Sequence, residues 1–258
     1  LHIFGPPDFF SHVEGKQAGY TWNLLNEYQN NFALNVTEVH SDKTLTRTYI
    51  CKDRFRPKKE QIQEPFSGIL LKEPSFSVEA ALLDHRVPCL GLSLVENFYT
   101  NIIKEGLREL GLPVGPWLNR FKKALYEKSD LGSDFRVTWE KRGSIIREKK
   151  FVLGDLAKKI ARISPGQKIT YITDIIGSLE NYEKVINLAR KADHLFIEAA
   201  FLDCDKETAR EKYHLTAREA GKLAKKAEVK QFTLFHFSQR YNHRAEDIEK
   251  EAMKAFLH

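Results

Sequence analysis

The last third of the chain alternates between strand-like and helix-like segments, and this alternation constrains the fold more than any other feature. Apolar runs typical of strands occupy 168–174, 194–201 and 231–237, and amphipathic helical patterns follow them at 179–193, 216–229 and 244–256. Three successive strand–helix units predict parallel strands joined by right-handed crossovers. The carboxyl ends of parallel strands meet at one edge of a sheet, where sites are built. The sequence therefore predicts an α/β protein with its chemistry at that edge.

Side chains that can bind a metal or transfer a proton stand at this predicted edge. Asp174, Glu198 and His236 each fall near the end of a predicted strand, and His214 stands just before a predicted helix. His85 lies in a turn between two further predicted strands. Imidazole and carboxylate are the ligands of hydrolytic zinc sites, which keep one position open for water. One histidine on an apolar strand is usually a core residue, but several at strand ends favour a metal centre.

The first half of the chain is predicted to be rich in strands. The chain begins directly in a strand-like run that a Gly-Pro-Pro turn stops, and we therefore expect it to lack its natural N-terminal part. Alternating patterns predict strands at 32–40 and 44–53, and the polar, proline-containing segment 54–65 is predicted to be a loop. The residues 76–96 predict two strands that flank the turn with the histidine, and 99–110 has a helical pattern.

Composition and length set wider limits. The 258 residues suit one large α/β domain or two small ones, and we expect one domain over 1–258. No apolar run approaches the roughly 18 residues that span a bilayer, so no membrane partner is expected. The three cysteines are odd in number and widely spaced, which argues against a disulfide framework and favours a cytoplasmic location.

The net charge of +6 is concentrated in the middle of the chain. Residues 101–150 carry twelve Lys or Arg against seven Asp or Glu, with five aromatic residues among them: Trp117, Phe121, Tyr126, Phe135 and Trp139. Basic groups can bind phosphates and aromatic rings can stack on bases, as on an RNA-facing surface. A solvated amphipathic helix and hairpin would have the same composition, and both interpretations stay open.

Several motifs, in this order along the chain, resemble those of the ribonuclease Z family. They are LDHRVPCLG around His85, the strand that ends at Asp174, and then FIEAAF, YHLTAREA and LFHFSQRY. This family comprises the tRNA 3′-processing endonucleases of the metallo-β-lactamase superfamily. The resemblance extends from Leu1 to about Tyr241. It implies a metallo-β-lactamase αββα sandwich, lacking its N-terminal start and carrying an inserted basic arm at 101–150 that grips tRNA.

The resemblance also implies a reaction and its partners. The expected activity is zinc-dependent removal of the 3′ trailer from precursor tRNA, by attack of a metal-activated hydroxide on the phosphodiester. The expected cofactor is two zinc ions in the complete protein, and the expected assembly is a homodimer. His85, Asp174 and His236 occupy the positions of metal ligands, with the aspartate between the two zinc ions.

The same resemblance assigns four further residues. His214 takes the position of the proton donor, Glu198 that of the carboxylate that orients it, and Arg240 and Thr216 lie where the family contacts the scissile phosphate. Thr216 and Glu219 also have the spacing of a capping box, so an N-cap role for Thr216 stays equally open.

The chain departs from the family pattern at two points. Asp174 stands in Thr-Asp-Ile, whereas the family has Gly-Asp-Thr, and the H-x-H-x-D-H run that supplies most other zinc ligands is absent from this sequence. That run either belongs to a missing N-terminal segment or is lost from an inactive homologue. Two alternative functions therefore stay open: a general phosphodiesterase or hydrolase of the same fold, and a non-catalytic RNA-binding homologue.

Overall fold

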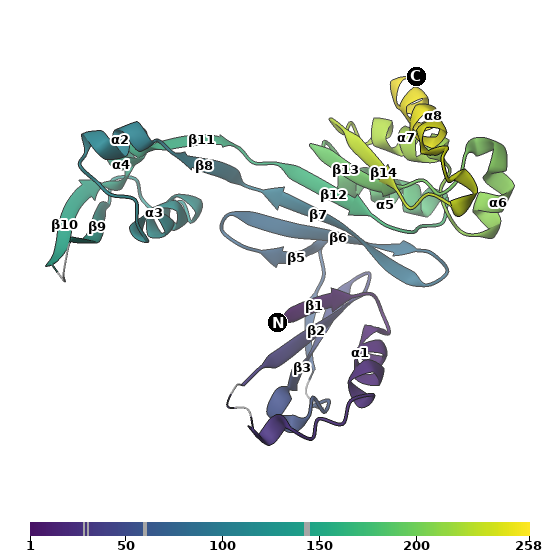
Figure 1. Cartoon of the computed structure of the whole chain (residues 1–258), viewed down its shortest axis with the longest axis horizontal. Coiled ribbons are helices and arrows are strands. Elements are labelled where there is room, and N and C mark those ends of the chain that lie inside the picture. Colours follow the sequence, from purple (N-terminus) through teal and green to yellow (C-terminus); the bar gives the residue numbers. More distant parts are fainter. Residues whose placement is uncertain (28, 30, 59–60, 142–144) are drawn as a thin grey trace. The chain divides into compact units, whose positions relative to one another are not determined.

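A computed structural model describes residues 1–258 except 28, 30, 59–60 and 142–144. The chain divides into two compact units (Figure 1). The first unit comprises Leu1–Leu70, Glu79–Ser93 and Ile169–His258, and the second comprises Leu71–Val78 and Leu94–Lys168. The expectation of one domain with an arm at 101–150 stays a prediction, although that range lies wholly within the second unit. Within the described residues, no helix is both long and apolar enough to cross a membrane.

A six-stranded sheet contains the alternating region, with the strand order β14-β13-β12-β7-β6-β5. The strands are β5 (Ile69–Lys72), β6 (Phe76–Asp84), β7 (Pro88–Glu96), β12 (Lys168–Ile172), β13 (His194–Glu198) and β14 (Phe232–Phe235). The strands β12, β13 and β14 pair in parallel. The predicted parallel strands, and the two predicted strands around the histidine turn, are thus confirmed.

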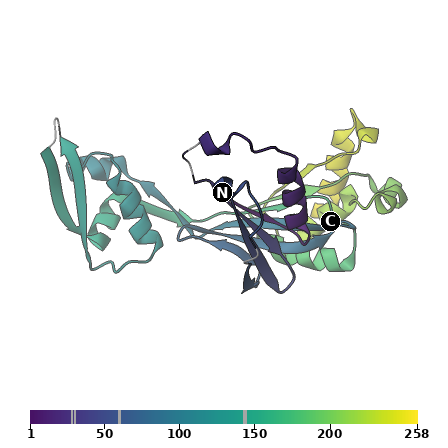
Figure 2. The ribbon, with the colours of Figure 1, turned by 90° about the horizontal axis from the view of Figure 1, so that it is seen from below.

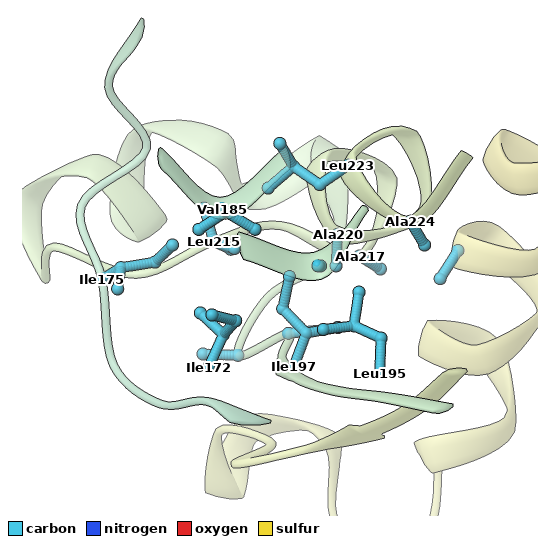
Figure 3. Packing of buried hydrophobic residues seen from close by; sticks show 14 of the residues in the cluster. Ile172, Ile175, Val185, Leu195, Ile197, Leu215, Ala217, Ala220, Leu223 and Ala224 are labelled. Carbon is cyan, nitrogen blue, oxygen red and sulfur yellow. The ribbon is translucent and has the colours of Figure 1, made fainter. Parts of the chain in front are cut away.

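Helices connect or follow these parallel strands and bury the apolar faces of the sheet. They are α5 (Leu179–Ala189), α6 (Lys206–Glu211), α7 (Ala217–Lys226) and α8 (Ala245–Leu257), with short 3₁₀ turns at Asp203–Asp205 and Gln239–Tyr241. In Figure 3, Ile172 and Ile197 of the sheet lie beneath Val185 of α5 and Leu223 of α7. Complete burial of each such side chain contributes roughly 1.5–3 kcal/mol to folding.

The helices α7 and α8 lie side by side and pack closely because α7 has a glycine at the contact (Figure 1). A Cβ atom on Gly221 would lie 2.1 Å from the carbonyl oxygen of Ala252. Ala220, Ala224 and Ala252 around it are buried, so the two backbones meet through small side chains. This close contact fixes the two helices against each other.

A four-stranded sheet in the order β1-β2-β3-β4 forms the rest of the first unit, together with one helix. Its elements are β1 (His2–Gly5), α1 (Phe9–Ala18), β2 (Ala33–Val39), β3 (Lys43–Ile50) and β4 (Ile62–Pro65), with 3₁₀ turns at Leu25–Glu27 and Cys51–Asp53. The expected loop at 54–65 is wrong at its end, because β4 pairs antiparallel with β3. All four β4 residues are exposed, so this edge strand is held by backbone pairing and carries no apolar signature.

In the described part of the second unit there are two short ladders and three helices (Figure 2, teal). Its elements are β8 (Phe98–Ile102), α2 (Lys104–Glu109), α3 (Trp117–Tyr126), β9 (Asp134–Lys141), β10 (Ile145–Val152), α4 (Leu153–Ile160) and β11 (Ala161–Pro165). The expected helix over 99–110 is wrong in its first half, where β8 pairs antiparallel with β11. The amphipathic helix that the basic segment allows is present as α3.

Aromatic residues of the basic segment belong to the hydrophobic core of this second unit. Trp117 is 1% exposed and Phe121 is fully buried, while Phe135 and Trp139 pack against the same cluster. The interpretation of Trp117 and Phe121 as base-stacking side chains is therefore wrong. Their burial leaves the basic residues of α3 on its opposite, solvent-facing side.

Replacing Gly221 by alanine should destabilise the protein, although alanine favours a helix, because the added Cβ meets backbone and cannot be accommodated by a side-chain rotation. We expect a loss of about 1–3 kcal/mol in the free energy of unfolding. The matched control is Gly15→Ala in α1, where a Cβ meets nothing within 4 Å; it should gain about 0.5–1 kcal/mol. Urea unfolding followed by circular dichroism measures both. A Gly221→Ala protein as stable as the parent would contradict the close packing.

Candidate functional site

The carboxyl ends of three neighbouring parallel strands carry the central candidate residues. Asp174 follows β12, Glu198 is the last residue of β13, and His236 directly follows β14. His214 precedes α7 and reaches the same edge through its contact with Glu198. The fold thus places four residues that are up to 62 positions apart in the sequence at one edge of the sheet.

Asp174, His214 and His236 form a group that can hold a metal ion. Each offers one ligand atom, and these atoms all lie within 4.8 Å of one another. Nδ1 of His236 is 3.5 Å from Oδ1 of Asp174, and the rings of His214 and His236 have centres 5.1 Å apart. The expected ligands were His85, Asp174 and His236. The group in the structure contains Asp174 and His236 but has His214 in place of His85.

His85 lies beside this group. Its ring centre is 5.0 Å from that of His214. Its Nδ1 is 2.8 Å from the carbonyl oxygen of Tyr213, to which the ring nitrogen donates, and this leaves Nε2 with a free lone pair. Arg86 also joins the His85 turn to Tyr213. Its guanidinium donates to the Tyr213 hydroxyl at 2.6 Å, and its Cζ atom lies 4.7 Å from the centre of the Tyr213 ring.

A buried carboxylate holds His214 in place. Glu198 is fully buried, and its carboxylate accepts hydrogen bonds from His214 Nδ1 at 3.1 Å and from the backbone N–H of Ile175 at 2.8 Å. The bond to Glu198 raises the pKa of His214, while burial raises the pKa of the Glu198 carboxyl. Because Nδ1 is occupied, Nε2 is the His214 nitrogen that remains for a metal or for proton transfer.

Asn181 fixes the two loops that carry His85 and Asp174. It is 1% exposed, and its amide accepts from the N–H of Asp84 at 3.0 Å and donates to the carbonyls of Asp84 at 2.8 Å and Ile176 at 2.9 Å. One side chain therefore joins the turn before His85 to the loop after Asp174. Sequence reasoning missed this residue, and the available signal was a polar side chain on the apolar face of the helical pattern at 179–193.

Thr216 is the N-cap of α7. Its hydroxyl accepts from the backbone N–H of Glu219 at 3.2 Å, and Glu219 accepts from the backbone N–H of Thr216 at 2.8 Å. The capping box is thus confirmed. Thr216 is also 1% exposed, so a direct substrate contact would require the loop around it to open.

Arg240 lies close to the same strand end but is paired within the protein. Its guanidinium donates to Asp205 at 2.9 Å, and the Tyr241 hydroxyl donates to the other oxygen of that carboxylate. About half of the Arg240 side chain is exposed. A phosphate contact by Arg240 would therefore compete with an existing ion pair.

The donor set fits zinc. Two imidazoles and one carboxylate are a known three-residue zinc set with a fourth position for water or substrate. Two ligands at about 2.1 Å from a tetrahedral ion stand roughly 3.4 Å apart, close to the separation of the Asp174 and His236 ligand atoms. Among the described residues this group supplies the ligands of one ion, and His85 adds a further imidazole next to it.

Sequence comparison relates the chain to ribonucleases Z. It is 25% identical over 240 residues to ribonuclease Z of Deinococcus radiodurans, covering 93% of this chain and 67% of that protein. It is 31% identical over 189 residues to the Brevibacillus brevis protein (73% of this chain, 52% of that one) and 26% identical over 257 residues to the Pediococcus pentosaceus protein (99% and 73%). The chain thus spans between about half and three quarters of the length of these relatives. No protein-family model matches the chain.

Two solved structures show weaker similarity. Human tRNase Z, short form, aligns with a TM-score of 0.47 and 17% identity over 93% of this chain and 62% of that one. The metallo-β-lactamase fold protein YhfI from Bacillus subtilis aligns with a TM-score of 0.40 and 15% identity over 74% of this chain and 48% of that one. The resemblance to ribonuclease Z that the motifs indicate is confirmed by the sequence relatives, at 25–31% identity.

Loss of either Asp174 or His236 should weaken Zn²⁺ binding by more than the roughly 10- to 100-fold that removal of an outer-shell partner costs. Competition with a chromophoric chelator measures this affinity for Asp174→Ala and His236→Ala. The matched control is His194→Ala, because His194 is an imidazole at the opposite end of β13.

The third ligand is decided by comparing His214→Ala with His85→Ala. A large loss of zinc affinity in the first variant alone would support the grouping in the structure, and a loss in the second alone would support the ligand set that the family resemblance implies. Unchanged affinity in Asp174→Ala and His236→Ala would contradict a metal site here.

Proposed function

On the premise that the chain is a homologue of ribonuclease Z, we propose that it is a metal-dependent endoribonuclease that removes the 3′ trailer from precursor tRNA. The observation that carries this proposal is the pair of His214 and the buried Glu198, set next to the Asp174–His236 pair. A proton donor beside a metal-binding group is what hydrolysis of a phosphodiester requires. We also propose the αββα sandwich, the cytoplasmic location and the homodimer that the family resemblance implies.

The proposed metal ligands are Asp174 and His236 with an imidazole from His85 or His214. When bound, zinc supplies Lewis acidity towards the phosphoryl oxygens and lowers the pKa of a nearby water. The protein's part is to hold these ligands at fixed separations before the ion arrives. The bonds that Asn181 and Glu198 make to the loop at 174–176 serve this purpose.

The proposed role of His214 is to protonate the leaving 3′-oxygen. Glu198 accepts the Nδ1 hydrogen, so Nε2 carries the proton that is transferred. The raised pKa of His214 favours its protonated form, which is present below that pKa and is lost as the pH rises through it. A positioned acid of this kind is typically worth about 10²–10⁴-fold in rate. Arg240 is proposed to offset charge on the phosphate after leaving Asp205, and Thr216 to border the same phosphate.

A non-catalytic RNA-binding homologue is the second candidate function. Within the described residues the metal-binding group supplies ligands for one ion, whereas the family resemblance implies two. Ile175, in the position of the family's threonine, is fully buried and offers no hydroxyl. A general phosphodiesterase of the same fold is the third, since related metal centres accept many substrates.

Incubation of the protein and Zn²⁺ with a precursor tRNA that carries a 3′ trailer tests the proposal. We expect cleavage at the trailer with a 3′-hydroxyl on the tRNA product, and loss of that cleavage in Asp174→Ala. Hydrolysis of a small aryl phosphodiester without trailer removal would favour the general phosphodiesterase. Binding of the tRNA without any hydrolysis would favour the non-catalytic homologue.

The basic segment should contribute to RNA affinity and not to chemistry. Deleting α3 would remove Trp117 and Phe121 from a core, so charge substitutions are the cleaner test. We expect Lys122→Gln, Lys123→Gln and Lys128→Gln together to raise the Kd for precursor tRNA several-fold, because each lost cation forfeits a phosphate contact. Turnover of a small aryl phosphodiester should stay unchanged. Unaltered tRNA affinity would show that the segment is only a solvated surface.

A further inference from the structure

A basic groove runs between α7 and α8, away from the residues assigned above. Its basic lining residues are Arg218, Lys222, Lys225, Lys226, Lys254 and His258. The groove has a volume of about 770 Å³. Only two acidic residues, Glu228 and Glu251, are among its lining, so the five lysines and arginines leave an excess of positive charge. We call this surface the α7/α8 groove.

Three lysines of the α7/α8 groove are available to bind an anion. Arg218 is paired with Asp203 at 2.9 Å, and Lys225 donates to the carbonyl of Leu257 at 3.4 Å. Glu251 already accepts the backbone N–H groups of Asp203 and Arg218. Among the described residues, no carboxylate pairs with the exposed side chains of the remaining three: Lys222, Lys226 and Lys254. Their charges repel one another unless an anion binds between them.

The backbone beneath the α7/α8 groove is rigid. Gly221 brings α7 against the carbonyl of Ala252, and the side chains at this contact are small and buried. Lys222 and Lys226 are one helical turn apart, so they project from the same face of α7. Lys254 follows Ala252 on the facing helix. The lysines are therefore presented from two fixed elements and not from a loop.

The groove begins near the candidate site. α7 starts at Ala217, three residues after His214. From Arg218 to Lys226 the helix rises about 12 Å, at 1.5 Å per residue. Along the axis of a stacked, helical strand the phosphates rise about 3.4 Å each, so that length corresponds to about three to four phosphates of such a strand. A strand whose scissile phosphate reached His214 could continue along this helix.

We propose that the α7/α8 groove binds the phosphate backbone of an RNA strand that passes through the candidate site. This inference rests on the proposed function for the kind of polymer, and it adds a contact surface that the basic segment at 101–150 does not include. We favour RNA over an anionic membrane because Ala255 is the one apolar residue of the groove lining, and the exposed Met253 and Leu257 of α8 lie outside that lining. A membrane-binding helix needs large apolar side chains beside its cations.

The test measures binding of a fluorescent 20-nucleotide oligouridylate to the whole chain in EDTA, so that no cleavage is needed. The plot of log Kd against log salt concentration should become shallower by about 2 units in the variant with Lys222→Gln, Lys226→Gln and Lys254→Gln, at about 0.7 unit per lost contact with single-stranded RNA. The matched control replaces Lys16, Lys52 and Lys72 by glutamine, which removes the same charge from exposed positions elsewhere. That control should keep the parent slope.

Three results would overturn the inference. The first is an unchanged salt slope in the groove variant, and the second is a change of the same size in the control variant. The third is a groove variant that loses binding to phosphatidylserine vesicles but still binds RNA as the parent does. Circular dichroism of both variants must match that of the parent, which it should because all six lysines are exposed. If the protein does not cleave the trailer but the groove variant shows the predicted slope change, the proposed function is rejected and the RNA-binding role of the α7/α8 groove is supported. Cleavage with an unchanged slope would reject the groove alone.

Discussion

The buried carboxylate of Glu198 is the constraint on which the candidate site depends. A charged group without exposure is costly unless its oxygens accept hydrogen bonds. Here the donors are the backbone of Ile175 and the ring of His214, so satisfying Glu198 brings the loop after β12 and the segment before α7 to the end of β13. Substituting the carboxylate would leave both donors without their partner. The same group that orients a histidine thus also determines where two separate loops can lie.

Asn181 extends this logic to the other half of the site. Its amide bonds to Asp84 and Ile176, so the turn that holds His85 and the loop that holds Asp174 cannot move independently. Asn181 bonds to backbone groups of these loops, and Glu198 bonds to one backbone N–H besides the His214 ring, so the arrangement depends little on the identity of most loop side chains. Groups fixed in this way before a ligand binds lose little entropy on binding, and this is the physical basis of preorganisation.

The sequence predicted the parts of the fold in which local pattern and tertiary burial agree. Strong apolar runs followed by amphipathic helices predicted β12, α5, β13, α7, β14 and α8, but not α6, and the spacing of Thr216 and Glu219 predicted the cap of α7. The pattern failed where a pairing partner decides the structure. The residues of β8 have a helical pattern, but they form a strand because β11 pairs with them. The burial of Trp117 and Phe121 could not be predicted either, because composition does not show which side of a helix faces the core. The strand ends predicted Asp174, Glu198 and His236 at one edge. The position of Asn181 on an apolar helix face indicated a buried polar role, but not which loops it joins.

The geometry of His214 limits the chemistry that the site can perform. An imidazole has two nitrogens, and Nδ1 of His214 is committed to Glu198. The remaining Nε2 cannot bind a metal and carry a proton to a leaving group at the same time. If Nε2 is a ligand, the proton must come from another group. His85 lies beside His214, and to supply the proton it would have to carry a hydrogen on Nε2 as well as on Nδ1, which donates to the Tyr213 carbonyl. If His214 is instead the acid, the proposed third ligand is His85, which does not belong to the close group of Asp174, His214 and His236. Which of the two histidines binds the metal therefore also bears on which of them can serve as the acid.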